Sequence, residues 1–150
     1  MVGIPVKISN PYALMTKGEM MATCRNQSML DLVAADTVSC GKWKRTNMQC
    51  GKCVPCLIRR ASFHAAKKVD NTSYALPGTD LQAVIEGSRN KDDLLAMILA
   101  TTTIKPTDIP SWLTSSGPLP LDRNARNALL DVARRGMDEM HTFLKHNHLV

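Results

Sequence analysis

The chain has 150 residues, and its 44% of apolar residues is enough for a buried core, which argues against a disordered protein. Its net charge of +6 favours anionic partners, but the 4% of aromatic residues disfavours a protein that binds single strands by stacking bases on many rings. The longest apolar run, residues 94–100, is too short for a membrane helix of about 20 residues, and the first 20 residues lack a secretory signal, so we expect a cytoplasmic protein without a membrane partner.

The first elements in chain order are a strand and two helices. Residues 4–9 alternate β-compatible side chains, which predicts one short strand followed by a turn. Thr16 and Glu19 form a capping-box pattern that predicts a helix from about Lys17. A weaker start signal predicts a second, shorter helix over residues 28–35.

The rest of the chain alternates helices with irregular connections. Pro55 suits the first turn of a helix over residues 56–68, and Asp122 suits the N-cap of a long final helix. Two further helices are predicted over residues 80–88 and 91–103. The segments expected to be irregular are residues 41–53, 70–79 and 105–121, the last of which contains four prolines. The sequence therefore predicts a mainly α-helical protein with one or two short strands and a cysteine loop.

Four of the five cysteines lie within 17 residues in the spacing C-x9-C-x2-C-x2-C; they are Cys40, Cys50, Cys53 and Cys56. In a cytosolic protein such a group indicates metal ligands rather than disulfides. A C-x2-C pair lets two thiolates bind one tetrahedral ion, and four thiolates leave no position for water. We therefore predict a structural zinc site.

Two alternatives to zinc remain open, an iron–sulfur cluster and a site without metal. Closely spaced cysteines suit an iron–sulfur cluster, but the bacterial pattern places its fourth cysteine after the triplet and before a proline. Cys24 lies outside the group, among apolar residues of a predicted helix, and is expected to be a buried free thiol.

The positive charge is concentrated around the cysteines. Residues 37–69 contain eight Lys and Arg and no Asp or Glu, whereas the rest of the chain has 11 basic and 13 acidic residues. These cations compensate the thiolates, form a contact surface for a nucleotide or nucleic acid, or do both. The chain has no G-x-x-x-x-G-K-[ST], G-x-G-x-x-G or G-x-S-x-G motif, so no catalytic residue is assigned.

Three segments follow one another in a recognisable order: MTKGEM (15–20), TVSC (37–40) and CGKCVPCLIR (50–59). They resemble the C-terminal region of the 7-cyano-7-deazaguanine synthase (QueC-type) family, which has an M-[ST]-K-x-E helix start, an S-C pair and a C-G-x-C-x-x-C-L-x-R tail. Residues 133–140 (ARRGMDEM), with Phe143 and Leu144, are closer to the QueC-like proteins of Qat phage-defence systems, QatC.

The resemblance implies the C-terminal part of an α/β PP-loop (adenine nucleotide alpha-hydrolase-like) fold. It implies a queuosine-pathway ligase that activates a deazapurine carboxylate, 7-carboxy-7-deazaguanine, with ATP and then forms the amide or nitrile. It implies zinc on the four cysteines, and it suggests that Lys17, Glu19 and Arg59 contact a substrate or partner. Residues 1–69 would be the zinc-binding part, and residues 70–150 a helical extension packed on it.

One departure from the family concerns ATP. The ATP-binding motif S-G-G-x-D-S precedes the matched region in the family and is absent from these 150 residues. We therefore expect the chain to be inactive alone and to use ATP only with a separate N-terminal PP-loop polypeptide, or to work with other defence-system proteins.

A second hypothesis is a small zinc-binding adaptor that binds nucleic acid or a protein through its basic loop. The predicted strand and the M-T-K-x-E helix start favour the first hypothesis, because a free-standing zinc ribbon needs neither.

Overall fold

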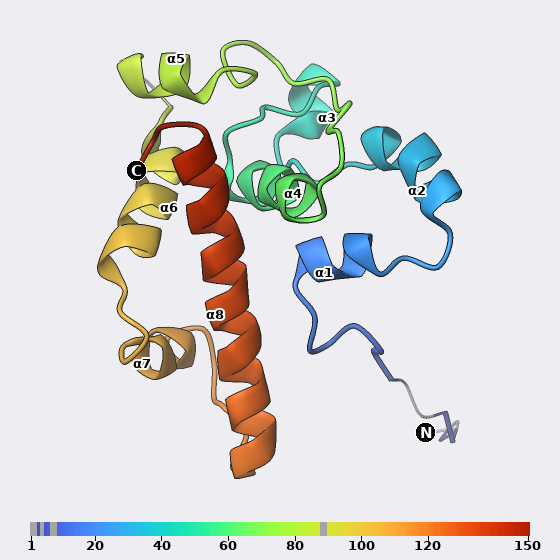
Figure 1. The fold of residues 1–150 in the computed structure, drawn as a ribbon, viewed down its shortest axis with the longest axis vertical. Helices are drawn as coiled ribbons and strands as arrows, with labels where there is room; N and C mark the ends of the chain where they lie inside the picture. The colour runs from blue at the N-terminus through green and yellow to red at the C-terminus, as the bar shows by residue number, and fades with distance from the viewer. Residues whose placement is uncertain (1–2, 4, 7–8, 88–89) are drawn as a thin grey trace.

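The structure, a computed structural model, describes residues 3, 5–6, 9–87 and 90–150, and these are mostly helical (Figure 1). The helices are α1 (Lys17–Ala22), α2 (Gln27–Val33), the 3₁₀ helix η1 (Ala34–Asp36), α3 (Trp43–Thr46), α4 (Val54–Ala65), α5 (Leu81–Glu86), α6 (Asp92–Thr103), α7 (Ile109–Thr114) and α8 (Arg123–His146). None of the helices in this described part is long and apolar enough to cross a membrane.

The mainly helical prediction is confirmed, whereas the short strands are not. The described residues contain no strand, and their β-pairing is a single parallel bridge between Gln49 and Tyr74. The strand predicted over residues 4–9 falls in part outside the described residues, because residues 4, 7 and 8 are not described.

Short side chains cap the helices much as the sequence predicts. Thr16 accepts a hydrogen bond from the Glu19 N–H while the Glu19 carboxylate accepts one from the Thr16 N–H, so the capping box is confirmed. The Asp122 carboxylate caps α8 by accepting a hydrogen bond from the Ala125 N–H. Pro55 lies in the first turn of α4, as predicted.

Two short helices lie in segments that are expected from the sequence to be irregular. α3 is a four-residue turn that ends at Asn47, whose φ of 50° is left-handed. α7 begins at Ile109, and Pro110 occupies its first turn, where the missing N–H costs no helical hydrogen bond. The expected helix at residues 28–35 starts slightly earlier, because Asn26 supplies the cap by accepting a hydrogen bond from the Met29 N–H.

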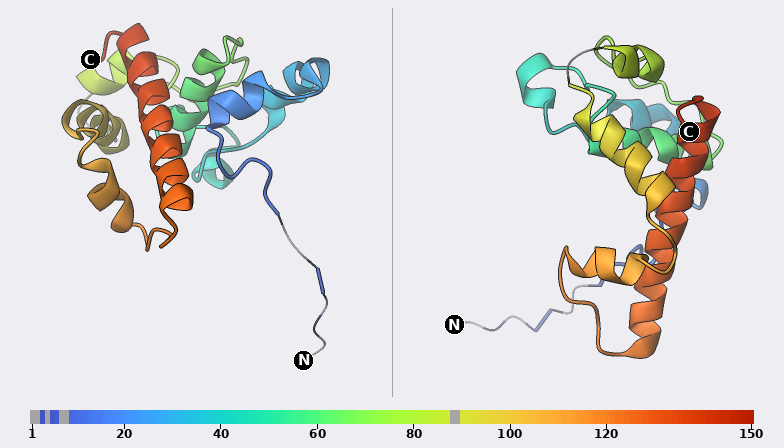
Figure 2. Two further views of the ribbon diagram at one scale, coloured as in Figure 1. Left: turned by 60° about the horizontal axis from the view of Figure 1, so that its bottom comes forward. Right: turned by 90° about the vertical axis from the view of Figure 1, so that its left-hand side faces the viewer.

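The main core lies where α8 crosses α4, α5 and α6. In Figures 1 and 2 (left), α8 runs between α6 and α7 on one side and α1, α2 and α4 on the other. The buried side chains of this core are Leu57, Ala61, Leu81, Val84, Leu94, Met140, Phe143 and Leu144. α4 and the C-terminal helices therefore share one apolar core, which positions the cysteine loop at the start of α4.

Candidate metal centre

The four cysteines predicted as ligands converge on one point. The Sγ atoms of Cys40, Cys50, Cys53 and Cys56 all lie within 4.8 Å of one another, and those of Cys40 and Cys53 are 3.9 Å apart. Two thiolates on a tetrahedral zinc ion with bonds of about 2.3 Å would be separated by about 3.8 Å. The spacing therefore fits one tetrahedral ion.

The local backbone explains how the sequence gathers these sulfurs. Gly51 has a φ of +73°, a left-handed conformation that glycine adopts without strain. This turn lets the Cys53 N–H donate to the Cys50 Sγ at 3.3 Å. The Cys40 Sγ accepts from the N–H groups of Lys42 and Cys50, each at 3.4 Å. Such N–H···S contacts stabilise thiolates, which are the form that binds metal.

Residues 70–79, expected from the sequence to be only a linker, cover the cysteines. The Ala75 N–H donates to the Gln49 carbonyl oxygen at 2.8 Å, and Tyr74 packs against the cysteine cluster. Gly78 lies so close to Cys50 that a Cβ on it would be 1.8 Å from the Cys50 carbonyl oxygen. The sequence signal for this contact is a glycine after Pro77, but its partner cannot be identified from local patterns.

Arg60 is a further residue of the site, and no local sequence pattern indicates its role there. Its guanidinium donates to the carbonyl oxygens of Gly51 at 3.2 Å and Gly78 at 2.8 Å, and it lies over the Tyr74 ring. Burial acts to lower the pKa of Arg60, with the charges of Tyr74 and Asp70 opposing it. Arg60 thus joins the turn between the cysteines to the covering segment.

The thiols differ in how readily they ionise. Burial acts to raise the pKa of Cys40, but the N–H groups of Cys50 and Lys42 outweigh it and lower that pKa to about 7. Burial raises the pKa of Cys53 and of Cys56, so the thiolate form of each is unfavourable unless a cation lies beside it. A divalent ion supplies that positive charge, and the donor set of four sulfurs fits zinc or iron.

The centre is closed to solvent on most sides. Cys40, Cys53 and Cys56 are buried, with Cys56 fully so, while Cys50 is half-buried.

Cys24 lies outside the centre. It was predicted to be a buried thiol on a helix but is half-buried in the turn after α1, and its Sγ contacts the Asn26 carbonyl oxygen at 3.5 Å.

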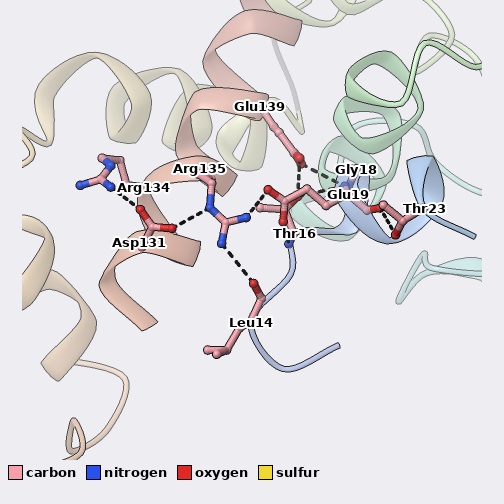
Figure 3. A network of polar contacts seen from close by, with 9 residues as sticks. All are labelled: Leu14, Thr16, Gly18, Glu19, Thr23, Asp131, Arg134, Arg135 and Glu139. Carbon is pink, nitrogen blue, oxygen red and sulfur yellow. Dashed lines mark hydrogen bonds and ion pairs between the residues drawn. The ribbon is translucent and has the colours of Figure 1, made fainter. Parts of the chain in front are cut away.

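Glu19, one of the three residues predicted from the resemblance to contact a substrate or partner, lies in a polar network between α1 and α8 (Figure 3). Its carboxylate accepts a hydrogen bond from Arg135, and that bond holds the pKa of Glu19 below its usual value. Arg135 also donates to the Leu14 carbonyl oxygen at 3.1 Å and pairs with Asp131 at 2.9 Å. This network attaches α1 to the C-terminal helix.

Arg59 and Lys17, the other two of these residues, line one apolar pocket next to α1 and α4. Arg59 is buried, with only 8% of its surface exposed, whereas Lys17 is exposed.

The basic segment, residues 37–69, is likewise divided between interior and surface. The Arg59 and Arg60 guanidinium groups bond to the protein interior, while Lys42, Lys44 and Arg45 are exposed on and next to α3.

Comparison with protein-family models gives a match to part of the chain. The family model described as "Queuosine biosynthesis protein QueC" matches residues 2–67, a range that contains all four clustered cysteines and Arg59. No curated protein and no solved structure matches the chain. Residues 2–67 are therefore similar to QueC, and in this region the chain carries a cysteine centre able to hold a metal ion.

Proposed function

We propose that this chain is the zinc-bearing C-terminal portion of a QueC-like, ATP-dependent synthase that amidates a deazapurine carboxylate or converts it to a nitrile. The observation that carries the proposal is the QueC match over residues 2–67, which includes the whole cysteine cluster. The same cluster supports zinc as a structural ion, because four sulfurs complete a tetrahedral shell and leave no site for a reacting water.

The zinc site would hold the start of α4 in place. Cys53 is the N-cap residue of α4, and Cys56 lies in its first turn, so the ion would join this helix to the loop that carries Cys40 and Cys50. Residues further along α4, such as Arg59, would then face the substrate from a fixed helix. In this proposal the ion organises the binding region and takes no part in the chemistry.

ATP binding would come from a segment that carries S-G-G-x-D-S. The 150 residues contain no S-G-G-x-D-S segment, so we infer that the chain alone does not adenylate a carboxylate. From the resemblance of residues 133–140 to QatC we also propose a place in a phage-defence system.

The test is pyrophosphate release from ATP in the presence of 7-carboxy-7-deazaguanine. The purified chain should release none, and adding a QueC-type polypeptide that carries S-G-G-x-D-S but ends before the cysteine region should restore release. A matched control replaces the aspartate of that motif with asparagine. Release by the chain alone, or no release from the complemented mixture, would contradict the proposal.

A second candidate function is the zinc-binding adaptor, and it rests on the exposed cations around α3. Lys42, Lys44 and Arg45 form no ion pair with a described residue, and Trp43 between them is 37% exposed. Binding to DNA should then weaken steeply with salt, and Lys44→Ala should lower the salt slope by about one. Weak binding that Lys44→Ala does not change would exclude the adaptor.

A further inference from the structure

α6 is apolar on two faces, and only one of them is covered. Leu94 is fully buried, and Met97 and Ile98 pack against the same core, so this face lies toward α8. Leu95 and Leu99 lie one turn apart on the outer face, and they are 37% and 59% exposed. Because a helix that is apolar all round is usually buried on every side, the outer face of α6 indicates a contact surface.

The outer face of α6 is uncharged over most of its length. Residues 94–104 contain no charged side chain, and Ala96 is exposed beside the leucines. The hydroxyls of Thr102 and Thr103 donate to carbonyl oxygens of the preceding turn at 2.8 and 2.6 Å, so their donors are already used. In Figure 2 (right), α6 lies on the side toward the viewer, and no other described helix passes in front of it. A second helix could therefore pack along this face without burying an unpaired polar group.

Opposite charges lie at the two ends of this face. Asp92 is exposed in the first turn of α6, and Lys105 is exposed shortly after the helix ends at Thr103. Among the described residues, neither of these two side chains takes part in an ion pair. The helix dipole favours this order of charges within one chain, and the same order makes the face complementary to itself.

We propose that α6 forms a weak homodimer contact with α6 of a second copy, the two helices running antiparallel across a two-fold axis. Such an axis brings the same surface of both chains together, so the surface must complement itself. An antiparallel pair places Leu95 of one copy against Leu99 of the partner subunit and each acidic end beside a basic end. A parallel pair would place like charges together, which opposes association. The contact is independent of the proposed function, because α6 lies outside residues 2–67, which match QueC.

The dimensions of a helix support this register. From the midpoint between Leu95 and Leu99, Asp92 lies five residues in one direction and Lys105 eight in the other. At 1.5 Å per residue these separations are about 7.5 and about 12 Å, so Asp92 is offset by about 5 Å from Lys105 of the partner subunit. The flexible four-carbon stem of lysine spans such an offset. One pair of short helices buries less than the roughly 1,200–2,000 Å² of a standard interface, so we expect a dissociation constant in the micromolar range.

The experiment is sedimentation velocity of the zinc-loaded chain at about 5 to about 500 µM, a range that brackets such a dissociation constant. The average mass should rise with concentration from 16.5 kDa toward twice that value. Leu99→Lys places a charge in the centre of the contact and should raise the dissociation constant at least tenfold. Leu32→Lys adds the same charge on α2, at a side chain that is 72% exposed, and should leave it unchanged. A chain that stays monomeric, or equal effects of the two variants, would overturn the proposal.

A charge swap tests the antiparallel orientation. Asp92→Lys and Lys105→Asp, made singly, each place like charges together at both ends of the dimer and should raise the dissociation constant three- to tenfold. The double variant restores opposite charges and should return the dissociation constant to within about twofold of wild type. The unfavourable charges on the dipole of each α6 remain in the double variant, so only pairing between chains explains a recovery. A double variant that associates no better than the single variants would overturn the antiparallel contact.

A different occupant of the outer face of α6 would be recognised in the complemented mixture. If the chain stays monomeric and Leu99→Lys, but not Leu32→Lys, abolishes pyrophosphate release there, α6 binds the polypeptide that carries S-G-G-x-D-S and the homodimer proposal is wrong. If the chain dimerises through α6 and the complemented mixture releases no pyrophosphate, the homodimer contact stands and the proposed function is wrong.

Discussion

The contact between Gly78 and Cys50 gives a sharp prediction about metal affinity. In Gly78→Ala, the new Cβ would lie 1.8 Å from the Cys50 carbonyl oxygen and 2.8 Å from its carbonyl carbon, whereas real Cβ atoms essentially never come closer than 3.0 Å. The neighbour is backbone, so no side chain can rotate away. The Cys50 backbone or the covering segment must therefore move by more than 1 Å. Ligand distances in a metal site tolerate only about 0.2 Å.

The expected loss follows from this displacement. Changes that disturb the outer supports of a metal site typically lower metal affinity about 10–100-fold, which corresponds to about 1.4–2.7 kcal/mol. We expect Gly78→Ala to lie at the upper end of this range, because it displaces a ligand residue directly. Zinc affinity is measured by competition with a chromogenic chelator of known affinity for zinc.

Gly41→Ala is the matched control. Gly41 follows Cys40 in the same loop, but a Cβ there meets no atom within 4 Å. Its zinc affinity should stay within about twofold of wild type, because surface changes without contacts are close to neutral. Equal zinc affinities for Gly78→Ala and Gly41→Ala would refute the reasoning that residues 70–79 support the metal centre.

Three further changes test other parts of the molecule. By elemental analysis, the wild-type chain should hold one zinc ion and Cys53→Ser much less than one. The variant should lose up to about 10 kcal/mol of the folding free energy that metal binding supplies. Iron at one ion per chain would contradict the zinc assignment. Glu19→Gln should lower the free energy of unfolding, measured in urea, by about 0.5–1 kcal/mol at neutral pH. Because the pKa of Glu19 in the folded protein lies below its ordinary 4.5, this difference from wild type should disappear only as the pH falls below 4.5. A difference that persists in more acidic solution argues against this ion pair. Leu144→Ala removes a fully buried core side chain and should lower the free energy of unfolding by about 2–5 kcal/mol. Leu121→Ala, at a residue that is 97% exposed, should change it by less than about 0.5 kcal/mol. Similar values for the two variants would contradict the described core.

The features predictable from the sequence are those set by neighbours along the chain. The four clustered cysteines could be identified as candidate ligands because the spacing of C-x2-C pairs suits the geometry of a tetrahedral ion. The capping box at Thr16 and the proline in the first turn of α4 were predictable for the same reason, since each depends on residues within one helical turn.

The features that could not be predicted are contacts between distant segments. Gly78 meets Cys50 across 28 positions, and Arg135 meets Glu19 across 116, so no local pattern connects them. Arg59 shows the same limit, because an arginine is usually exposed and its burial becomes evident only when Thr37 and Thr72 are seen beside it. α7 was missed because prolines usually interrupt helices, although Pro110 lies where a helix tolerates it.

The metal centre and the Arg59 guanidinium are joined by a short chain of contacts, which leads to a last prediction. Cys56 and Arg59 lie one turn apart on α4. Gln49, next to Cys50, donates to the Thr37 carbonyl oxygen at 3.1 Å, and the Thr37 hydroxyl accepts from Arg59 at 2.7 Å. Displacing Cys50 should therefore disturb the position of Arg59 as well.

Gly78→Ala tests this coupling, because Gly78 is not among the hydrogen-bond partners of Arg59. With zinc at one equivalent and a chelator present, hydrogen exchange at the Arg59 Nε–H, followed by NMR, should be at least tenfold faster in the variant than in wild type, since a larger fraction of the variant lacks the ion. Excess zinc should return the exchange rate to within about threefold of wild type, because occupancy by mass action offsets a weaker affinity. If the exchange rate in Gly78→Ala is the same with limiting and with excess zinc, while the bound zinc differs, then the ion does not position Arg59, and the apolar contacts of α4 with α8 hold it without the ion.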